Sequence, residues 1–522
     1  MMHKTLKIRS RTRRAALGLT LGLALVALSA CDSLLEVDLP HLLTDAALEG
    51  PDTAETQVNS AIALFECGYT TFGWVALGHE DVLEAIAGLG ATAAVYRATP
   101  SAGTCDTSTF DQSWFDQIMG ARSMLSRADS FGVYDRINGE DWSLGAAGER
   151  LSAISSIYLA ATYKHLGEFL CEMAFDGSGL VTPADAMAIA ETWVGTALGH
   201  IGGTDFAMPF GIATSATKMA TALRAQIRWA KADATPTGHS SPADLAAAAA
   251  DAATVLAADP TFTAWVTREA PETRRNRIHH TATEIVLSTM YDKIDFWAPA
   301  TRRPNPATGA IWADPIIFTG YIGLAIEADG RTVSDAGYPL TTADVTAAGV
   351  VDTRVQHFDG PGTGAGTFTI PKRYNDVSDD VPLVTWKELR LIQAENANVT
   401  GDRAGAIAFV NMVRADPANP GLPAVTYIDG TATFQQVRYL IHEERRRAFF
   451  MEGARYYSTK IQNTDISWFP RNEGDTPSLA SYDLQGGVRM LFAGDEYRLN
   501  SDFLSLDDRG TGCAADQAPW II

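Results

Sequence analysis

Apolar residues recur three and four positions apart along most of this 522-residue chain, which places them on one face of an α-helix. The later segments of this kind are rich in Ala, the strongest helix former. Thr182 can cap one of these helices with its side chain. Pro183 then stands at the first helical position, where its missing N–H needs no hydrogen-bond partner. The pattern predicts helices over residues 54–65, 114–131, 147–170, 183–201, 218–232 and 242–258.

Two regions break this pattern. Residues 297–382 are rich in Pro, Gly and Thr and include short β-like runs such as 367–370, and the chain from residue 466 onward is similarly irregular. Connections of this length in a compact protein are usually functional loops or disordered segments. The glycine-rich run 360–366 lacks the Gly-Lys-Ser/Thr ending of a phosphate-binding loop, so we interpret it as a hairpin tip.

Two segments, residues 158–167 and 391–412, are similar to tetratricopeptide units. In the second, one helix ends near Thr400, Gly401-Asp402 turns the chain, and residues 404–413 return. Short polar, Gly or Pro breaks between helices favour antiparallel helix pairs, although the repeat period is irregular. We therefore predict a mainly α fold of irregular tetratricopeptide-like helix pairs that form a scaffold, with long loops and a few short β-hairpins.

The N-terminal 30 residues differ from the rest of the chain. They contain six basic and no acidic side chains, and residues 15–30 are uncharged and mostly apolar. Sixteen residues are too few for a membrane span and suit a secretory signal. The run ends in Leu28-Ser29-Ala30-Cys31, which resembles a bacterial lipobox, so we expect residues 1–30 to be a lipoprotein signal peptide and Cys31 to be lipidated. An ordinary signal peptide with a chance Cys is the alternative.

The charge balance excludes one class of partner. The chain has 41 basic and 62 acidic side chains, a net charge of −21, and without the first 30 residues the net charge is −27. Because an acidic surface repels phosphate, we expect no nucleic-acid partner. A hydrophobic content of 46% is enough for a sizeable core and excludes disorder of the whole chain.

The cysteines point to disulfides. An exported protein can form them, and four Cys remain once Cys31 is lipidated. These four residues are Cys67, Cys105, Cys171 and Cys513. They are widely spaced and form no CxxC motif, which argues against a zinc site. Two disulfide bridges are expected, and all three possible pairings stay open.

No motif in the sequence indicates a catalytic reaction. His442-Glu443 begins like a zinc-protease helix, but Arg446 stands where the second His ligand is needed. The chain has no Gly-x-Ser-x-Gly nucleophile motif and no carboxylate pair that stands out. We therefore predict no catalytic residue, no metal and no cofactor.

The tryptophans fall into two groups. Trp114, Trp193 and Trp229 lie in helical patterns and are predicted to pack in the core. Trp297 and Trp312 lie in the Pro-rich region, where loop aromatics suit sugar recognition, because the C–H face of a sugar ring stacks on an aromatic plane. Packing of the loop onto the scaffold is an equally open interpretation.

Several motifs occur in the order found in one family, the SusD/RagB outer-membrane nutrient-uptake lipoproteins. The acidic, Leu-rich stretch after Cys31 resembles the family's opening, and residues 54–64 and 110–125 resemble its first helical blocks. The C-terminal half carries the most specific similarity, in the segments 352–354, 372–374, 386–395, 401–402, 411–414, 442–447 and 450–455. The Glu-Arg-rich helix at 442–447 itself is interpreted as structural, since Arg forks suit carboxylate partners.

The resemblance implies a non-enzymatic, lipid-anchored protein of the outer membrane that faces the exterior. It implies capture of oligosaccharides, sometimes peptides, and their delivery to a TonB-dependent, SusC-like transporter. It also implies a tether over residues 31–56 and one SusD-like domain over 57–522, with an N-terminal part (57–296), a loop-rich ligand region (297–382) and a C-terminal motif part (383–522). The expected ligand-binding residues are Trp74, Tyr96, Trp297 and Trp312.

Two alternative hypotheses for the function stay open. One is a lipid-anchored glycan-degrading enzyme, and the other is a tetratricopeptide-like assembly scaffold without a small ligand. The sequence leaves the identity of the nutrient open, because stacking on aromatic rings tolerates many sugars.

Overall fold

The structure is a computed structural model in which two compact units are distinguished, Met1–Thr53 and Ala54–Ile522. In the first unit, residues 50–53 are described and include the short 3-10 helix η1 (Pro51–Thr53). The elements discussed below all belong to the second unit. The described residues are 50–80, 114–139, 142–235, 238–271, 274–280, 325–330, 332–333, 349–361, 367–463, 489–490, 492 and 500–502.

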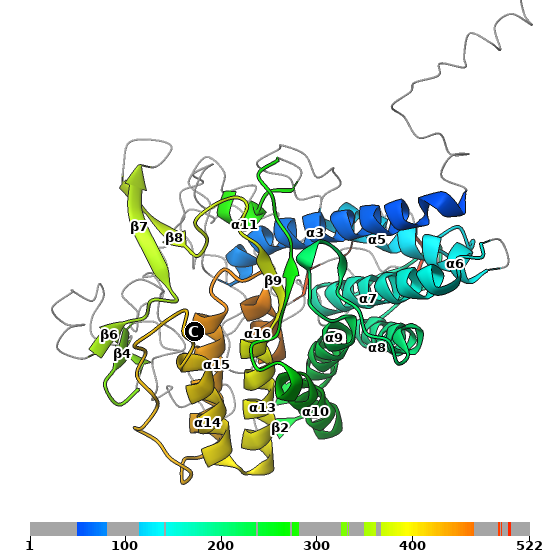
Figure 1. The fold of residues 1–522 in the computed structure, drawn as a ribbon. Coiled ribbons are helices and arrows are strands. Elements are labelled where there is room, and N and C mark those ends of the chain that lie inside the picture. Colours follow the sequence, from blue (N-terminus) through cyan, green and yellow to red (C-terminus); the bar gives the residue numbers. More distant parts are fainter. Residues whose placement is uncertain are drawn as a thin grey trace, which may run out of the picture. The chain divides into compact units, whose positions relative to one another are not determined.

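Helices dominate the described part of the second unit (Figure 1). Helices that follow one another in the chain pack against one another, from α3 with α5, through α7, α8, α9 and α10, to α13, α14 and α15. The helices are α3 (Ala54–His79), α5 (Trp114–Leu125), α6 (Val133–Asn138), α7 (Gly145–Phe169), α8 (Pro183–Ile201), η2 (Pro209–Gly211), α9 (Ala216–Lys231), α10 (Pro242–Ala258), α11 (Arg277–His279), α13 (Trp386–Thr400), α14 (Arg403–Arg414), α15 (Phe434–Ala448) and α16 (Arg455–Gln462).

The strands are short and form small antiparallel sheets in the described residues. Strand β3 pairs with β9, which leads directly into α13, and β7 pairs with β8 from Gln356↔Lys372 to Pro361↔Thr367. The glycine-rich run therefore joins two paired strands, as predicted for a hairpin, although residues 362–366 lie outside the described part. The strands are β1 (Ala234–Thr235), β2 (Gly238–His239), β3 (Thr263–Val266), β4 (Ala325–Glu327), β5 (Thr332–Val333), β6 (Gly349–Val351), β7 (Gln356–Pro361), β8 (Thr367–Lys372) and β9 (Val381–Thr385).

The predicted fold class is confirmed: the protein is mainly helical, with helix pairs and a few short strands. Helices α8 and α10 have the predicted bounds, and the turn at Gly401-Asp402 separates α13 from α14. Gly401 has a φ of 92°, a left-handed conformation that glycine adopts without strain. Among the described helices, none combines the length and apolar character that a bilayer-spanning segment requires.

Two predicted helices end more than two residues away from the observed ends. Helix α3 continues beyond residue 65 to His79, because apolar side chains such as Phe72 keep facing the core. Helix α5 stops at Leu125 and not near residue 131. The side chain of Asp135 accepts hydrogen bonds from the Ser126 hydroxyl and the Arg127 N–H, both at 2.9 Å, and these contacts hold the following segment in a loop.

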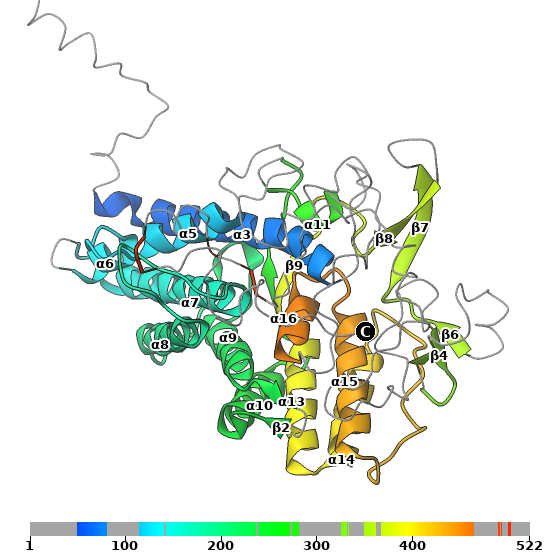
Figure 2. The same cartoon turned by 180° about the vertical axis from the view of Figure 1, so that it is seen from behind.

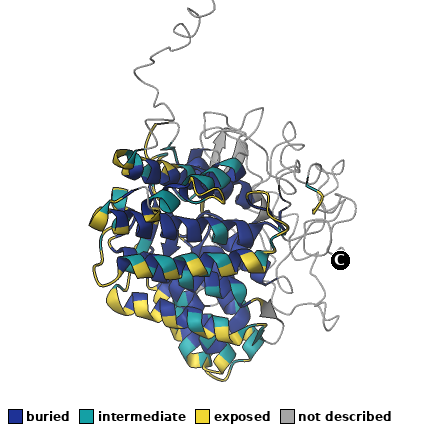
Figure 3. Cartoon of the chain, turned by 90° about the vertical axis from the view of Figure 1, so that its right-hand side faces the viewer, coloured by how far each residue is buried: buried dark blue, intermediate teal, exposed yellow. Residues whose placement is uncertain are grey.

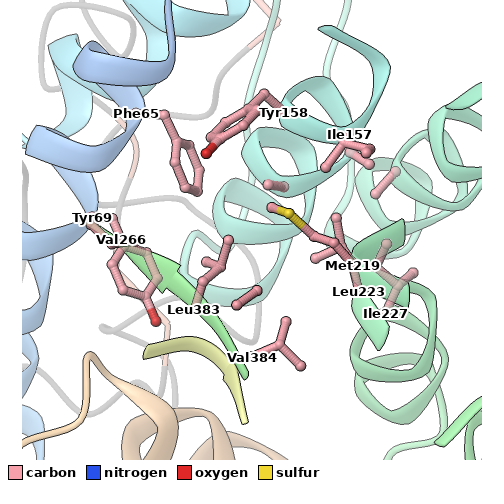
Figure 4. Close-up of a cluster of buried hydrophobic side chains, with 14 of the residues drawn as sticks. Phe65, Tyr69, Ile157, Tyr158, Met219, Leu223, Ile227, Val266, Leu383 and Val384 are labelled. Carbon is pink, nitrogen blue, oxygen red and sulfur yellow. The ribbon is translucent and has the colours of Figure 1, made fainter. Parts of the chain in front are cut away.

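The main hydrophobic core lies between α3, α7, α9 and the β3–β9 pair (Figure 4). The predicted core tryptophans are confirmed: Trp114 and Trp229 are buried, and Trp193 packs partly buried against the same core. Figure 3 shows the helices with buried inner faces and exposed outer faces. A second apolar cluster lies between α13, α14 and α15, which stand side by side (Figure 2).

A buried ion-pair network confirms the structural interpretation of the Glu-Arg-rich helix, α15. Glu444 accepts hydrogen bonds from Arg354 and from the Nε of Arg414, the latter at 2.9 Å. Arg447 bonds Glu443 at 2.6 Å and Asp352 at 3.2 Å. The network joins the segment after β6 to α14 and α15, and its carboxylates and guanidinium groups compensate one another away from water.

Candidate functional site

The predicted site residues are only partly placed by the structure. Trp74 lies in α3 and is 9% exposed within the main core, so packing accounts for its position. Tyr96, Trp297, Trp312 and the lipidation residue Cys31 lie outside the described residues. Their roles, and the grouping of the four aromatic residues, stay predictions.

A pocket of about 460 Å³ lies where β3, β9 and the start of α13 meet. We call it the tryptophan pocket, after Trp265 and Trp386, which both line it. Its remaining lining comes from these same three elements, from the segment after β8, from the segment after α14 and from the turn after α15. These residues are Thr263, Arg373, Tyr374, Asp379, Asp380, Pro382, Thr385, Lys387, Asp416, Ala418 and Glu452.

Trp265 is presented to this pocket by an irregularity in the β3–β9 pair. Ala264 pairs with Val384 but Trp265 pairs with Pro382, so the register shifts between the two residues of β3. Such bulges redirect side chains and are frequent beside binding sites. The Trp265 side chain is 37% exposed, an unusual position for a large aromatic residue.

Trp386 stands at the first position of α13. The Thr385 hydroxyl caps this helix by accepting a hydrogen bond from the Lys387 N–H at 3.4 Å. The Lys387 Nζ lies 5.9 Å from the centre of the Trp386 ring and 2.7 Å from Asp416. Burial alone would raise the pKa of the Asp416 carboxyl, but the hydrogen bond and charge of Lys387 lower it below its usual value.

Asp379 and Asp380 are each fixed through one carboxylate oxygen. Asp379 Oδ2 accepts hydrogen bonds from the backbone N–H groups of Asn375 at 2.6 Å and Asp376 at 3.1 Å. Asp380 Oδ1 accepts one from the Arg268 N–H at 2.7 Å. Within the described residues, the second oxygen of each carboxylate has no hydrogen bond to protein. These groups are therefore held in place with one oxygen available to a ligand.

The turn after α15 contributes Glu452 to the lining of the pocket. Glu452 there pairs with Arg373 through Oε1, while Oε2 has no hydrogen-bond partner in the described part of the chain. The turn contains three residues with positive φ, Met451 at 57°, Gly453 at 67° and Ala454 at 68°. Backbone strain of this kind occurs preferentially at functional sites.

The pocket thus combines two aromatic rings with hydrogen-bond donors and acceptors. Arg373 and Lys387 can donate, and Asp379, Asp380 and Glu452 can accept. Its polar groups are fixed before a ligand arrives, which lowers the entropy cost of binding. In the described residues, no three His, Cys, Asp or Glu side chains are grouped so that they could hold a metal ion.

The sequence alone does not predict this pocket. Trp386 belongs to one of the family-like segments, and Trp265 lies in a short run, residues 263–266, between a helix and polar loops. The available signal is that an aromatic residue begins a helix directly after the capping Thr385. Without the strand pairing, however, nothing in the chain indicates that Trp265 and Trp386 are neighbours.

Neither a protein-family model nor a curated protein matches this sequence. Several solved structures are similar to it. They include a SusD-like carbohydrate-binding protein of Bacteroides vulgatus (15% identity, covering 79% of this chain and 83% of that one, TM-score 0.48). They also include NanU of B. fragilis (12%, 87% and 95%, 0.48) and a SusD superfamily protein of B. vulgatus (13%, 87% and 98%, 0.48). Two of these three structures are described as SusD-like or as members of the SusD superfamily.

Proposed function

We propose that this protein is a lipid-anchored, non-enzymatic protein of the outer membrane that captures oligosaccharides outside the cell and delivers them to a TonB-dependent, SusC-like transporter. The observation that supports ligand capture is the tryptophan pocket. An exposed Trp265 ring, a second ring at Trp386 and fixed carboxylates surround a volume of about 460 Å³, which is within the range of small-ligand sites.

The chemistry of the pocket suits a sugar. A sugar ring offers an apolar C–H face, which stacks on an aromatic plane, and a rim of hydroxyls, which donate and accept hydrogen bonds. Arg373 and Lys387 can donate hydrogen bonds to the hydroxyl oxygens of a sugar, and the second oxygens of Asp379 and Asp380 can accept hydrogen bonds from its hydroxyl groups. The loop residues Trp297 and Trp312 and the early residue Tyr96 are proposed as further contacts.

The cellular part of the proposal rests on the sequence. The basic start, the sixteen-residue apolar run and Leu28-Ser29-Ala30-Cys31 support lipidation at Cys31. The family-like motifs in the C-terminal half support the outer-membrane location and the transporter partner. A retained body with a net charge of −27 suits a water-facing protein that is held by its lipid alone.

Ligand capture is tested by affinity electrophoresis of the mature protein against a panel of polysaccharides. We expect retardation by at least one glycan, and we expect Trp265→Ala to weaken that binding at least tenfold while the thermal unfolding midpoint changes little. Trp193→Ala, which changes a partly buried tryptophan of α8 outside the pocket, is the matched control. Unchanged binding by Trp265→Ala would contradict the proposed site, and release of shorter sugars from the bound glycan would favour the enzyme alternative.

The location is tested separately in cells. Labelled palmitate should be incorporated by the wild type and not by Cys31→Ala, and the variant should leave the membrane fraction. Surface exposure is measured by protease treatment of intact cells, and the partner by co-purification of a barrel transporter with the lipidated protein. A Cys31→Ala protein that still fractionates with membranes would refute the lipid anchor.

A further inference from the structure

We propose that the tryptophan pocket selects glycans that carry no acidic groups, and that Asp379 and Asp380 exclude uronate and sulfate sugars. This inference rests on the proposed function and adds the class of ligand. It follows from the charges that line the pocket, from the oxygen atoms that they leave available, and from a cation already placed beside Trp386.

The first step is the balance of charge. The lining contains two cations and four carboxylates. Arg373 is paired with Glu452, and Lys387 is paired with Asp416 at 2.7 Å. Both cations of the lining are therefore compensated. Arg268 lies next to Asp380, but its guanidinium pairs with Glu66 at 2.8 Å, so the charges of the two aspartates are left over. A bound carboxylate or sulfate would meet this excess negative charge in a concave site, where water screens charges less than it does on an open surface.

The second step is hydrogen bonding. Asp379 and Asp380 each use one carboxylate oxygen to accept hydrogen bonds from backbone N–H groups. The other oxygen of each ionised carboxylate has no proton to donate, so it can only accept a hydrogen bond from a ligand. Glu452 is 3% exposed, lines the pocket and has an unpartnered Oε2, which adds a buried acceptor. Sugar hydroxyls supply donors to such oxygens. An ionised carboxylate or a sulfate ester supplies none, so it would leave these acceptors unsatisfied.

The third step separates neutral from cationic ligands. A negative pocket with tryptophans could also attract a basic peptide, which would place a cation over a ring. At Trp386 that position is taken, because Lys387 Nζ lies 5.9 Å from the ring centre. Arg373 is a second resident cation in the same lining. The pocket therefore fits an uncharged ring better than a Lys or Arg side chain.

The test compares polysaccharides that differ only in charge. Suitable pairs are dextran with dextran sulfate, and carboxyl-reduced with native polygalacturonate, supplemented by neutral xyloglucan and galactomannan. Affinity electrophoresis or calorimetry at low ionic strength should show binding to at least one neutral glycan. Where a neutral glycan of a pair is bound, its acidic partner should bind at least tenfold more weakly, and the difference should shrink in higher salt.

The variant for this test is the double change Asp379→Asn and Asp380→Asn. Asparagine keeps an oxygen for the backbone N–H groups, so the loop should stay folded, but the excess charge is removed. We expect the preference for the neutral glycan to fall below about threefold. The double change Glu55→Gln and Glu149→Gln alters the net charge equally at exposed positions on α3 and α7 and should leave the preference unchanged. If the double aspartate variant is unstable, Asp380→Asn alone gives the same direction of change.

The outcomes separate the two proposals. Equal or tighter binding of the acidic glycans, or a preference that the aspartate variant does not reduce, would overturn this inference and leave glycan capture intact. Displacement of a bound glycan by oligolysine would overturn the choice of an uncharged ligand. Failure of the wild type to bind any glycan of the panel would overturn the proposed function, and this inference with it.

Discussion

At the scale of single residues, two carboxylates lie between pairs of cations in different surroundings. Glu444 is fully buried between Arg354 and Arg414. Glu191 is 24% exposed and bonds two basic side chains of α9, each at 2.7 Å. Burial alone would raise the pKa of Glu444, but the charges of Arg354 and Arg414 lower it, so this residue is ionised in the folded protein.

Neutralising these two carboxylates should have unequal effects on stability. Glu444→Gln removes the charge that compensates two buried guanidinium groups, and we expect the free energy of unfolding to fall by about 3–5 kcal/mol. Glu191→Gln, in contact with solvent, should cost less than about 1 kcal/mol. Urea unfolding followed by circular dichroism at pH 7 measures both values. Equal losses would show that burial does not determine the strength of these ion pairs.

Glu80 makes stability depend on pH in the opposite direction to a paired carboxylate. Burial raises its pKa from 4.5 to about 8, against the hydrogen bond that its Oε1 accepts from the Tyr457 N–H at 3.0 Å. The folded state therefore binds a proton more tightly than the unfolded chain does. The resulting stability is fully present below about pH 4.5 and is lost as the pH rises through about 8.

Replacing Glu80 by Gln should remove this dependence. Relative to Glu80→Gln, the wild type should lose up to about 4 kcal/mol of unfolding free energy between pH 5 and pH 8. The measurement is a series of urea unfolding curves for both proteins at four pH values. Parallel stability profiles for the two proteins would contradict the raised pKa.

At the scale of elements, helix ends were the most predictable features. The Thr182 side chain accepts from the Asp185 N–H and the Asp185 side chain accepts from the Thr182 N–H, a local capping box that fixes where α8 starts. At the start of α10, the Ser241 side chain accepts a hydrogen bond from the Asp244 N–H, and Pro242 stands at the first helical position. Such signals lie within a few residues of one another. The end of α5 depends on Asp135, nine residues beyond Ser126, so no local signal in the sequence predicts it.

The turn between α15 and α16 gives a prediction about backbone conformation. Gly453 has a φ of 67°, and a Cβ there would lie 2.9 Å from the Tyr69 ring. Gly401 has a φ of 92° with open space around it. Gly401→Ala should therefore cost about 1–2 kcal/mol from the left-handed backbone alone, whereas Gly453→Ala should cost more by the clash with Tyr69.

Thermal and urea unfolding of both alanine variants give this comparison directly. The excess loss in Gly453→Ala should be accompanied by weaker glycan binding, because the same turn holds Glu452 against Arg373. Equal destabilisation of the two variants would mean that the turn yields to the extra methyl group without strain.

At the scale of the molecule, the candidate site is assembled from segments far apart in the sequence. Trp265, Arg373, Trp386, Asp416 and Glu452 span almost 190 residues and meet only because β3 pairs with β9 and α15 packs beside α13. Periodicity and capping act locally, so they predict helices and their order. They contain no information on which loops converge. The Pro-rich loop composition and the family resemblance both indicate other aromatic residues as ligand contacts.

The disulfides are the molecule-scale prediction that the structure supports in part. Cys67 of α3 and Cys171, just after α7, are both disulfide-bonded, while Cys105 and Cys513 lie outside the described residues. We expect the mature, lipidated protein to contain two bridges and no free thiol, as an oxidising location allows. Mass spectrometry of the unreduced, denatured protein after thiol alkylation tests this, and any alkylated cysteine would contradict it. In Cys171→Ser, the single thiol that becomes reactive should identify the partner of Cys171.

Each bridge limits the conformations of the unfolded chain, so reduction of the wild type should lower the free energy of unfolding by about 2–4 kcal/mol per bridge.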